Sequence, residues 1–223
     1  MDVLDAIRNR RSIRAFKKDA VPREMIRTIL EIATWAPSAM NTQPWEFAVV
    51  TGEPLQQIKE GNAAALNAGE IPEPEHHVVG WTNDSIYRTR QVELAKQIFE
   101  IMGIPREDKV KRSQWMERGF RYFDAPVAII IYVDKSLTEG GPVLDIGAVM
   151  QNICLAALPF GLATCIHDQG VMYPKVVKKY AGIPDTKRLM IAISLGYPDE
   201  SARENTVRST REPIDNIASW VGF

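Results

Sequence analysis

The chain has 223 residues, a length that can bury one full core and lies within the range of a single domain. Apolar residues make up 45% of it and charged residues 25%, which is the ordinary composition of a globular protein. The formal net charge of −1 gives no electrostatic reason to expect a nucleic-acid or membrane partner.

Neither a targeting segment nor a disulfide is expected. No apolar run approaches the length of a membrane-spanning helix, and the acidic start at 1–5 has no secretory pattern. Cys154 and Cys165 lie in apolar surroundings, so buried free thiols are expected rather than a disulfide. The sequence therefore predicts a cytoplasmic protein.

The first part of the chain is predicted to hold three helices and one strand. Asp2 can cap a first helix, and Pro22 opens a second at a position where its missing N–H costs nothing. The second helix carries apolar residues at helical spacing, so it is expected to pack on the core. The run at 46–51 predicts a strand, and 54–68 predicts a helix.

The first clear break in this pattern is at 70–83, which contains two prolines, a glycine and the pair His76-His77. Adjacent histidines cannot easily share one ion, and no cysteine or second histidine cluster is near. No metal site is therefore expected.

Two long charged helices are predicted next, at 85–102 and 106–123. The block at about 84–123 separates two strand-bearing halves, so we interpret it as a helical insertion that covers another part of the molecule. A plain surface hairpin and a dimer-contact arm are the alternatives, because these helices carry an ordinary apolar stripe.

The second half alternates strands and helices. Strands are predicted at 127–133, 161–167 and 189–195, and helices at 143–158 and 173–180. The helix at 143–158 is apolar nearly all round, as a central buried helix must be. The tail at 199–223 turns apolar at its end, so this C-terminal arm is expected to dock on its own domain or on a partner subunit.

An arginine cluster follows the first helix. Four arginines fall within seven residues: Arg8, Arg10, Arg11 and Arg14. Guanidinium groups suit phosphate because their planar fork donates bidentate hydrogen bonds. On charge alone, an exposed basic helix end is the favoured interpretation. Ser12, a small donor among the arginines, favours an oxyanion site instead.

The stretch at 36–45 lies between a helix and a strand. Pro37 ends the helix and Pro44 marks the start of the strand. Between them, small hydrogen-bonding residues would let backbone and amide groups approach a flat polar ligand: Ser38, Asn41, Thr42 and Gln43. Local chemistry alone favours an ordinary connection.

Familiar catalytic signatures are missing from the sequence. No Gly-x-Gly-x-x-Gly follows a strand, and no Walker-type glycine loop or Gly-x-Ser-x-Gly elbow occurs. There is no Cys-x-x-Cys, and three histidines leave little from which to build a triad. A phosphate site without its own nucleotide fold remains, which fits a cofactor held by scattered loops.

Six motifs in order resemble the nitroreductase family of FMN-dependent oxidoreductases. They are Arg-Arg-Ser-x-Arg at 10–14, Ala-Pro-Ser-x-x-Asn-x-Gln-Pro-Trp at 36–45, Asp-x-Gly-x-x-x-Gln-Asn at 145–152, Gly-Leu-x-Thr-Cys at 161–165, Gly-Tyr-Pro at 196–198 and Arg-x-Pro at 211–213. Each is weak alone, but together they span nearly the whole chain. The resemblance implies one α+β domain at 1–223, with a mostly antiparallel sheet flanked by helices, built as an intertwined homodimer.

The resemblance also implies FMN at the dimer interface. The phosphate and ribityl chain would be held by Arg10, Arg11, Ser12, Arg14, Arg208 and Arg211. Pro37, Ser38, Ala39, Asn41 and Gln43 would come from the other subunit. The backbone of Ile166 and His167 would face the flavin N5 edge. Family members often have Trp or Pro after Thr-Cys, so Ile166 departs from the pattern, which bears on flavin reactivity and substrate rather than on FMN binding.

The implied reaction passes hydride from NADH or NADPH through flavin N5 to a small organic acceptor, such as a nitroaromatic or a quinone. Donor and acceptor would use one flavin face in turn, by a ping-pong mechanism, and no catalytic side chain is required. The alternatives are a flavin enzyme of different chemistry, such as reductive dehalogenation or flavin breakdown, and a non-catalytic flavin-binding protein.

The insertion supplies candidate acceptor residues: Tyr87, Arg88, Arg121 and Phe123. An aromatic wall stacks on a planar acceptor, and an arginine beside it pairs with a carboxylate or nitro oxygen. The stretch 87–109 is similar to the subgroup that reduces nitrobenzoate-type compounds, so an anionic nitroaromatic acceptor is predicted.

Overall fold

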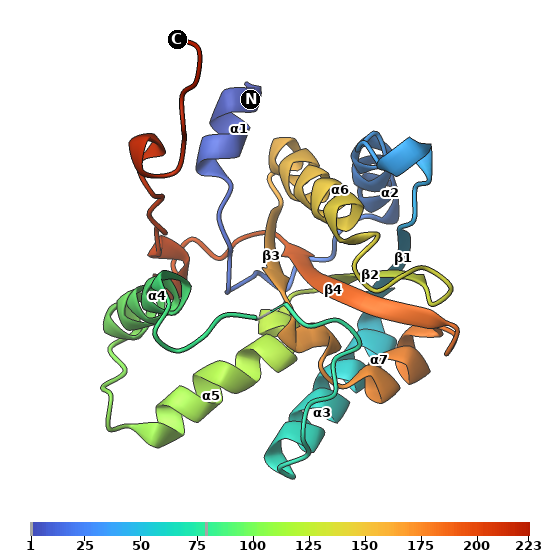
Figure 1. The fold of residues 1–223 in the computed structure, drawn as a ribbon. Coiled ribbons are helices and arrows are strands. Elements are labelled where there is room, and N and C mark those ends of the chain that lie inside the picture. The colour runs from blue at the N-terminus through green and yellow to red at the C-terminus, as the bar shows by residue number, and fades with distance from the viewer. Residues whose placement is uncertain (1, 79) are drawn as a thin grey trace.

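The computed structural model describes residues 2–78 and 80–223, which form a four-stranded antiparallel sheet with helices on both faces (Figure 1). Met1 and Val79 lie outside the described residues, and Val79 falls within the break predicted at 70–83. The prediction of an α+β fold with an antiparallel sheet is confirmed.

The sheet has the strand order β1-β2-β4-β3, so β1 and β3 form its two edges. The strands are β1 (Glu46–Thr51), β2 (Val127–Asp134), β3 (Ala163–His167) and β4 (Lys187–Gly196). Each agrees with its predicted range to within two residues. An edge strand leaves a row of backbone groups open to further pairing.

The helices are α1 (Val3–Asn9), α2 (Arg23–Ala33), α3 (Gly52–Asn67), α4 (Ile86–Met102), α5 (Lys109–Phe120), α6 (Val143–Ala157) and α7 (Pro174–Ala181). Each predicted helix is present. Asp2 stands at the start of α1, but its side chain makes no capping hydrogen bond. The predicted helix at 106–123 is shorter than expected, because the chain leaves the helix after Phe120.

The continuous apolar sequence of β2 follows from its central place in the sheet. Ile129 and Ile131 face the cluster formed with α2 and α6, whereas Ala128 and Ile130 face the cluster formed with α3 and α7. Side chains alternate between the two faces of a strand, so a strand covered on both faces must be apolar throughout.

The prediction that no apolar run approaches the length of a membrane-spanning helix is wrong for one segment. Val143–Phe160, which contains α6, is long and apolar enough by length and composition alone. Val149 and Ile153 of this segment are fully buried against α2 and the sheet. Of the residues in this segment, 33% are buried and most others are partly buried, but Leu144 at its start is 85% exposed.

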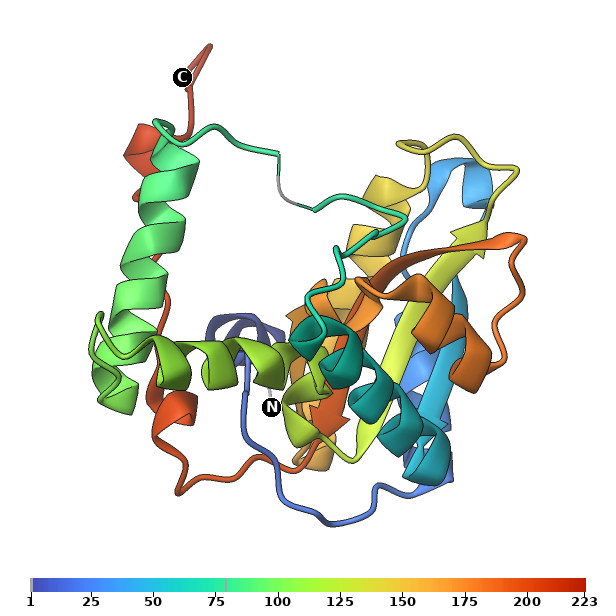
Figure 2. The same cartoon turned by 90° about the horizontal axis from the view of Figure 1, so that it is seen from below.

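The predicted insertion forms an arm (Figure 2). α4 stands away from the sheet and meets α5 at a steep angle, and the C-terminal segment runs beside α4. Arg90 pairs with Glu212 at 2.7 Å, and Ile98, Trp115 and Val207 form a small buried cluster between α4, α5 and the tail. The insertion and the C-terminal arm therefore pack on each other.

A left-handed turn, η2 (Tyr122–Asp124), joins α5 to β2. All three of its residues have positive φ, at 57°, 51° and 58°, a conformation that costs non-glycine residues about 1–2 kcal/mol each. Buried side chains of α3 hold the two ends: Lys59 Nζ donates to the Ala125 carbonyl at 2.8 Å, and the Asn62 amide donates to the Phe120 carbonyl. The turn persists because its surroundings over-determine it.

Candidate functional site

The arginine-bearing segment runs along the free edge of β3. Ser12 forms a parallel bridge with Thr164, and the Ile13 amide donates to the Thr164 carbonyl at 2.9 Å. Ile13 is buried, so alternation puts the partly buried Arg10, Ser12 and Arg14 on the side of the segment opposite Ile13. Arg11 falls on the side of Ile13 by the same alternation.

A buried asparagine side chain holds the backbone of this segment in place. Asn205, only 4% exposed, accepts hydrogen bonds from the Arg14 amide at 2.7 Å and the Ala15 amide at 3.2 Å. Its own amide group donates to the Ala15 carbonyl at 2.8 Å and to the Asp199 carbonyl at 2.9 Å. All four hydrogen-bonding positions of the side chain are used, so its identity and orientation are tightly specified.

A second contact ties the segment to the helical arm. Arg118 of α5 donates to the buried carboxylate of Glu204 and to the Arg14 carbonyl at 2.8 Å. The backbone at Arg14 is thereby held from both α5 and the C-terminal segment. Sequence reasoning missed Asn205, Arg118 and Glu204, because each is far from Arg14 in the chain and none belongs to a recognised motif.

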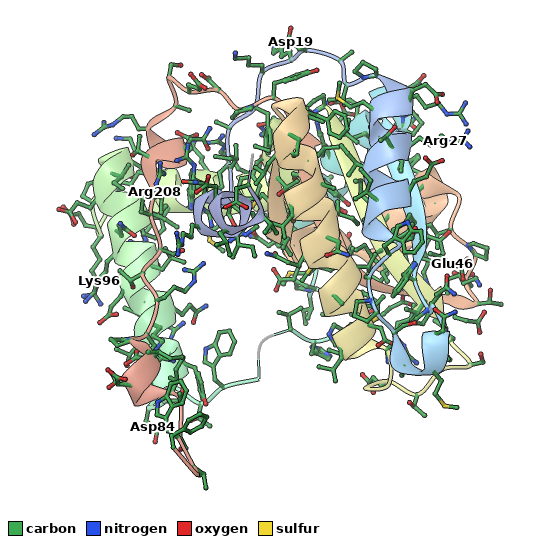
Figure 3. All side chains as sticks on the ribbon, turned by 90° about the horizontal axis from the view of Figure 1, so that it is seen from above. Asp19, Arg27, Glu46, Asp84, Lys96 and Arg208 are labelled. Carbon is green, nitrogen blue, oxygen red and sulfur yellow. The ribbon has the colours of Figure 1, made fainter. Side chains whose placement is uncertain are left out.

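Three arginines gather at this edge without acidic partners. Among residues 2–78 and 80–223, no recorded ion pair involves Arg10, Arg14 or Arg208. Arg208 follows the Asn205 turn, and Figure 3 shows it between α4 and α1. Burial raises the pKa of the Cys165 thiol, and the positive charges of Arg14 and Arg10 oppose that rise, so both guanidinium groups lie near it. The result is a cationic corner on the edge of β3.

Arg211 does not join this corner within one chain. Its guanidinium group donates to the Ser209 hydroxyl at 2.8 Å and to the Thr210 carbonyl. It lines a small hollow of about 420 Å³ against α4 instead. Of the predicted phosphate residues, Arg10, Ser12 and Arg14 are thus brought together beside Cys165, and Arg208 follows the Asn205 turn, with its guanidinium group donating to the carbonyls of 205–207. Arg211 lies apart from them, and Arg11 is turned to the other side.

His167, at the end of β3, is buried and neutral. The Gly170 amide donates to Nδ1 at 3.2 Å, so Nε2 carries the proton and donates to the Ser194 hydroxyl at 2.9 Å. Ser194 in turn donates to the Tyr122 carbonyl at 2.8 Å. Burial, assisted by the positive charge of Arg14, lowers the pKa of His167 to about 3. The side chain holds the turn after β3 and does not supply a proton near neutral pH.

The loop at 36–45 lies apart from the cationic corner. It follows α2, with α6 between it and α1 (Figure 1). The Ala39 amide donates to Asp145 at the start of α6, and the Gln43 amide donates to the Ser38 hydroxyl at 3.0 Å. Pro37, Asn41 and most other side chains of the loop are exposed. One chain therefore contains two separate parts of the predicted cofactor site.

The four candidate acceptor residues fall into two pairs. Tyr87 and Arg88 are exposed on the first turn of α4, and Arg88 donates to the neutral amide of Gln91 at 2.6 Å. Arg121 is paired with both Asp124 and Glu117, at 2.8 and 3.0 Å. Phe123 is buried beneath α5, with its ring against His167 and Trp115. These contacts favour structural roles for Arg121 and Phe123.

Comparison with known proteins places these features in a family. The nitroreductase family pattern matches residues 7–197. The chain is 36% identical to a nitrobenzene nitroreductase of Ectopseudomonas oleovorans, over 97% of this chain and 96% of that protein. It is 31% identical to a 4-nitrobenzoate reductase of Pseudomonas putida, over 100% of this chain and 97% of that protein. The fold matches the crystal structure of the FMN- and NADPH-dependent nitroreductase NfnB from Sphigopyxis sp. strain HMH, with a TM-score of 0.95 and 30% identity over the full length of both chains.

Proposed function

Because the chain belongs to the nitroreductase family, we propose that it is an FMN-dependent enzyme that uses NADH or NADPH to reduce nitroaromatic compounds. The observation that carries the proposal is the cationic corner beside β3. Three guanidinium groups gather there without an acidic partner among the described residues.

The residues of this corner fit a flavin mononucleotide. Its terminal phosphate carries close to two negative charges, and Arg10 and Arg14 can each donate charge-assisted hydrogen bonds to it. Ser12 adds a hydroxyl donor between them, and Arg208 adds a further cation. No described carboxylate neutralises these groups. Arg14 and Arg208 donate only long hydrogen bonds of 3.2–3.4 Å to backbone carbonyls, which a phosphate could replace with shorter charge-assisted ones.

Bound FMN would supply the two-electron chemistry between nicotinamide and nitro group. The chain's own residues would bind the FMN and set its position. Asn205 and Arg118 hold the backbone at Arg14. The neutral His167 side chain holds the turn at 167–170, because its Nδ1 accepts the Gly170 amide. The loop at 36–45 offers its exposed amides to the flavin of a second subunit.

The working unit in this proposal is a homodimer. The end of the C-terminal arm leaves large apolar side chains in solvent: Ile214, Ile217, Trp220, Val221 and Phe223. The free edge of β1 borders a groove of about 810 Å³ with an apolar wall from Ile26, Leu30 and Phe47. An extended segment can pair with an exposed strand edge and fill such a groove. The arm of one subunit would do this on the other.

The open surface of α6 supports the same assembly. Leu144 is 85% exposed on this apolar helix, and α1 exposes Val3, Leu4 and Ile7. Apolar patches of this kind mark protein interfaces. We expect deletion of residues 214–223 to give a monomer or an aggregate with little flavin, measured by light scattering with absorbance detection. A soluble, flavin-loaded monomer would refute the two-chain site.

The acceptor would lie beside Tyr87 and Arg88 on α4, where an exposed ring adjoins a guanidinium group that donates to the neutral Gln91 side chain and has no ion pair recorded within 2–78 and 80–223. Arg88→Ala is expected to raise KM for 4-nitrobenzoate more than KM for nitrobenzene, since only the former carries a carboxylate. Arg90→Ala is the matched control, because Arg90 already pairs with Glu212. Equal KM changes for the two acceptors would remove Arg88 from the site.

The decisive test of the function is anaerobic. Purified protein loaded with FMN should lose its flavin absorbance when NADH or NADPH is added, and should regain it when a nitroaromatic compound follows. Failure of both nucleotides to reduce the flavin would instead indicate a non-catalytic flavin protein.

A further inference from the structure

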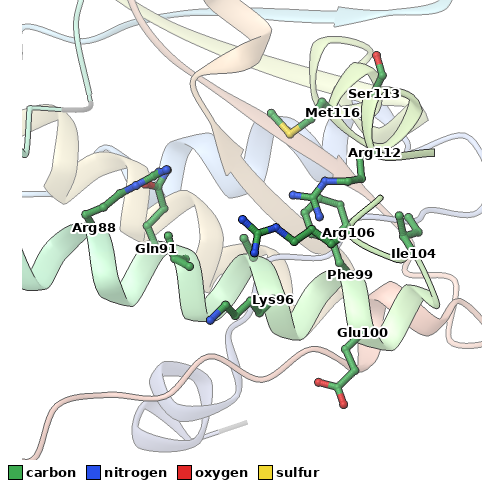
Figure 4. Close-up of a pocket in the computed structure, with 12 residues that line it drawn as sticks. Arg88, Gln91, Lys96, Phe99, Glu100, Ile104, Arg106, Arg112, Ser113 and Met116 are labelled. Carbon is green, nitrogen blue, oxygen red and sulfur yellow. The ribbon is translucent and has the colours of Figure 1, made fainter. Parts of the chain in front are cut away.

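A second charged hollow lies away from the cationic corner, in the angle between α4 and α5 (Figure 4). It measures about 970 Å³, which is at the upper end of the range for small-molecule sites. One wall is apolar and includes Phe99, Ile104 and Met116. Four cationic side chains and one carboxylate also line it: Arg88, Lys96, Arg106, Arg112 and Glu100.

The cations of this groove are not neutralised. No ion pair recorded for the described ranges involves Lys96, Arg106 or Arg112. The Arg112 guanidinium group lies 3.9 Å from the centroid of the Phe99 ring, and Figure 4 shows Arg106 next to it and Glu100 pointing away. Like charges held together repel, and a bound anion would relieve that repulsion.

The groove is long and has arginine side chains at both ends. It extends along α4 from Arg88 to Phe99, eleven residues or about 16 Å at 1.5 Å per residue. Arg88 stands beside Tyr87 at one end. At the other end Arg112 lies over the Phe99 ring, and Arg106 lies next to Arg112. An elongated ligand with a planar group and a distal phosphate would match both the length and the charge.

We propose that this groove binds the phosphorylated adenosine end of NADPH, with Arg106 and Arg112 on the 2′-phosphate. The inference rests on the proposed function, because it takes the reductant from there. It adds a specificity: NADH lacks the 2′-phosphate, so the two guanidinium groups would favour NADPH over NADH.

The test measures binding directly and needs no turnover. Adenosine 2′,5′-bisphosphate and adenosine 5′-monophosphate are titrated by calorimetry into the FMN-loaded protein, so that the cationic corner is already filled. The double variant Arg106→Gln, Arg112→Gln removes both charges and keeps the side-chain lengths similar. Lys111→Ala is the matched control, since Lys111 lies on α5, pairs with Asp108 and does not line the groove.

We expect the bisphosphate to bind the parent and the Lys111→Ala control about tenfold or more tightly than the monophosphate, as lost charge-assisted hydrogen bonds imply. The double variant should lose that difference, and its ratio of kcat/KM for NADPH over NADH should fall accordingly. Equal binding of the two nucleotides to the parent, or undiminished bisphosphate binding by the double variant, overturns the inference. A protein that reduces nitro compounds with either nucleotide but shows no such preference would refute the groove and leave the proposed function standing.

Discussion

Asn205 offers the sharpest test of how the cationic corner is built, because it is buried and its side chain fixes the backbone that carries Arg14. Asn205→Ala removes four hydrogen bonds, to the Arg14 and Ala15 amides and to the Ala15 and Asp199 carbonyls. At about 1 kcal/mol for each bond, the expected loss of unfolding free energy is about 4 kcal/mol. That corresponds to a fall in Tm of about 8–16 °C for a chain of this size.

The effect on ligand binding separates positioning from general destabilisation. Below its lowered Tm, the variant should bind FMN about tenfold or more weakly, because a displaced Arg14 loses a charge-assisted hydrogen bond to phosphate. Riboflavin lacks the phosphate, so its affinity should change much less. Flavin fluorescence titration of the flavin-free protein gives both constants, and Asn216→Ala, an exposed amide in the same C-terminal segment, is the control. If the folded variant keeps the parent ratio of FMN to riboflavin affinity, Asn205 does not position the phosphate site.

Three further results are expected. Arg10→Ala and Arg14→Ala should each weaken FMN binding, by about 1.5–3 kcal/mol in fluorescence titration, whereas Arg11→Ala should have the smaller effect; full flavin loading of the first two at low FMN would remove them from the site. His167 has a pKa of about 6.5 in the unfolded chain and about 3 in the folded chain. Between these values only the unfolded chain binds the proton, so the free energy of unfolding falls as the pH is lowered from about 6.5 to about 3, by up to about 1.4 kcal/mol per pH unit. Urea unfolding of parent and His167→Gln between pH 4 and 7 should show a shallower pH dependence for the variant, and equal slopes would contradict a buried neutral histidine. Initial rates with NADPH and a nitroaromatic varied together should give parallel double-reciprocal lines, since one site serves both; intersecting lines would contradict the shared site.

Much of the fold could be predicted because the signals are local. The β2 run is continuous and apolar since both faces of the central strand are covered, and helical spacing places α2 on the core. The departures arise where tertiary contacts override local preference. Residues 122–124 continue a helical pattern in sequence, yet Lys59 and Asn62 of α3 hold them in a left-handed turn. Nothing in the local sequence predicts that turn.

The site divides in the same way. Arg10, Ser12 and Arg14 could be chosen from sequence because their type and spacing suit phosphate, and pairing with the edge of β3 puts them on one side. The residues that position them could not, since Asn205 is 191 positions away from Arg14 and acts only through its backbone.

Arg121 illustrates the opposite limit. Its type and its place beside aromatic residues suggest anion recognition, but Asp124 and Glu117 already use its charge. The sequence does not show whether an acidic residue already pairs with an arginine in the folded chain, and only an arginine without such a partner is available to a ligand. Arg106 and Arg112 have no acidic partner recorded among residues 2–78 and 80–223, although neither belongs to any of the six sequence motifs. For that reason the α4–α5 groove is found from the structure and not from the motifs. Our proposal therefore places the preference for NADPH over NADH on the helical arm and not on the sheet edge that would hold the flavin.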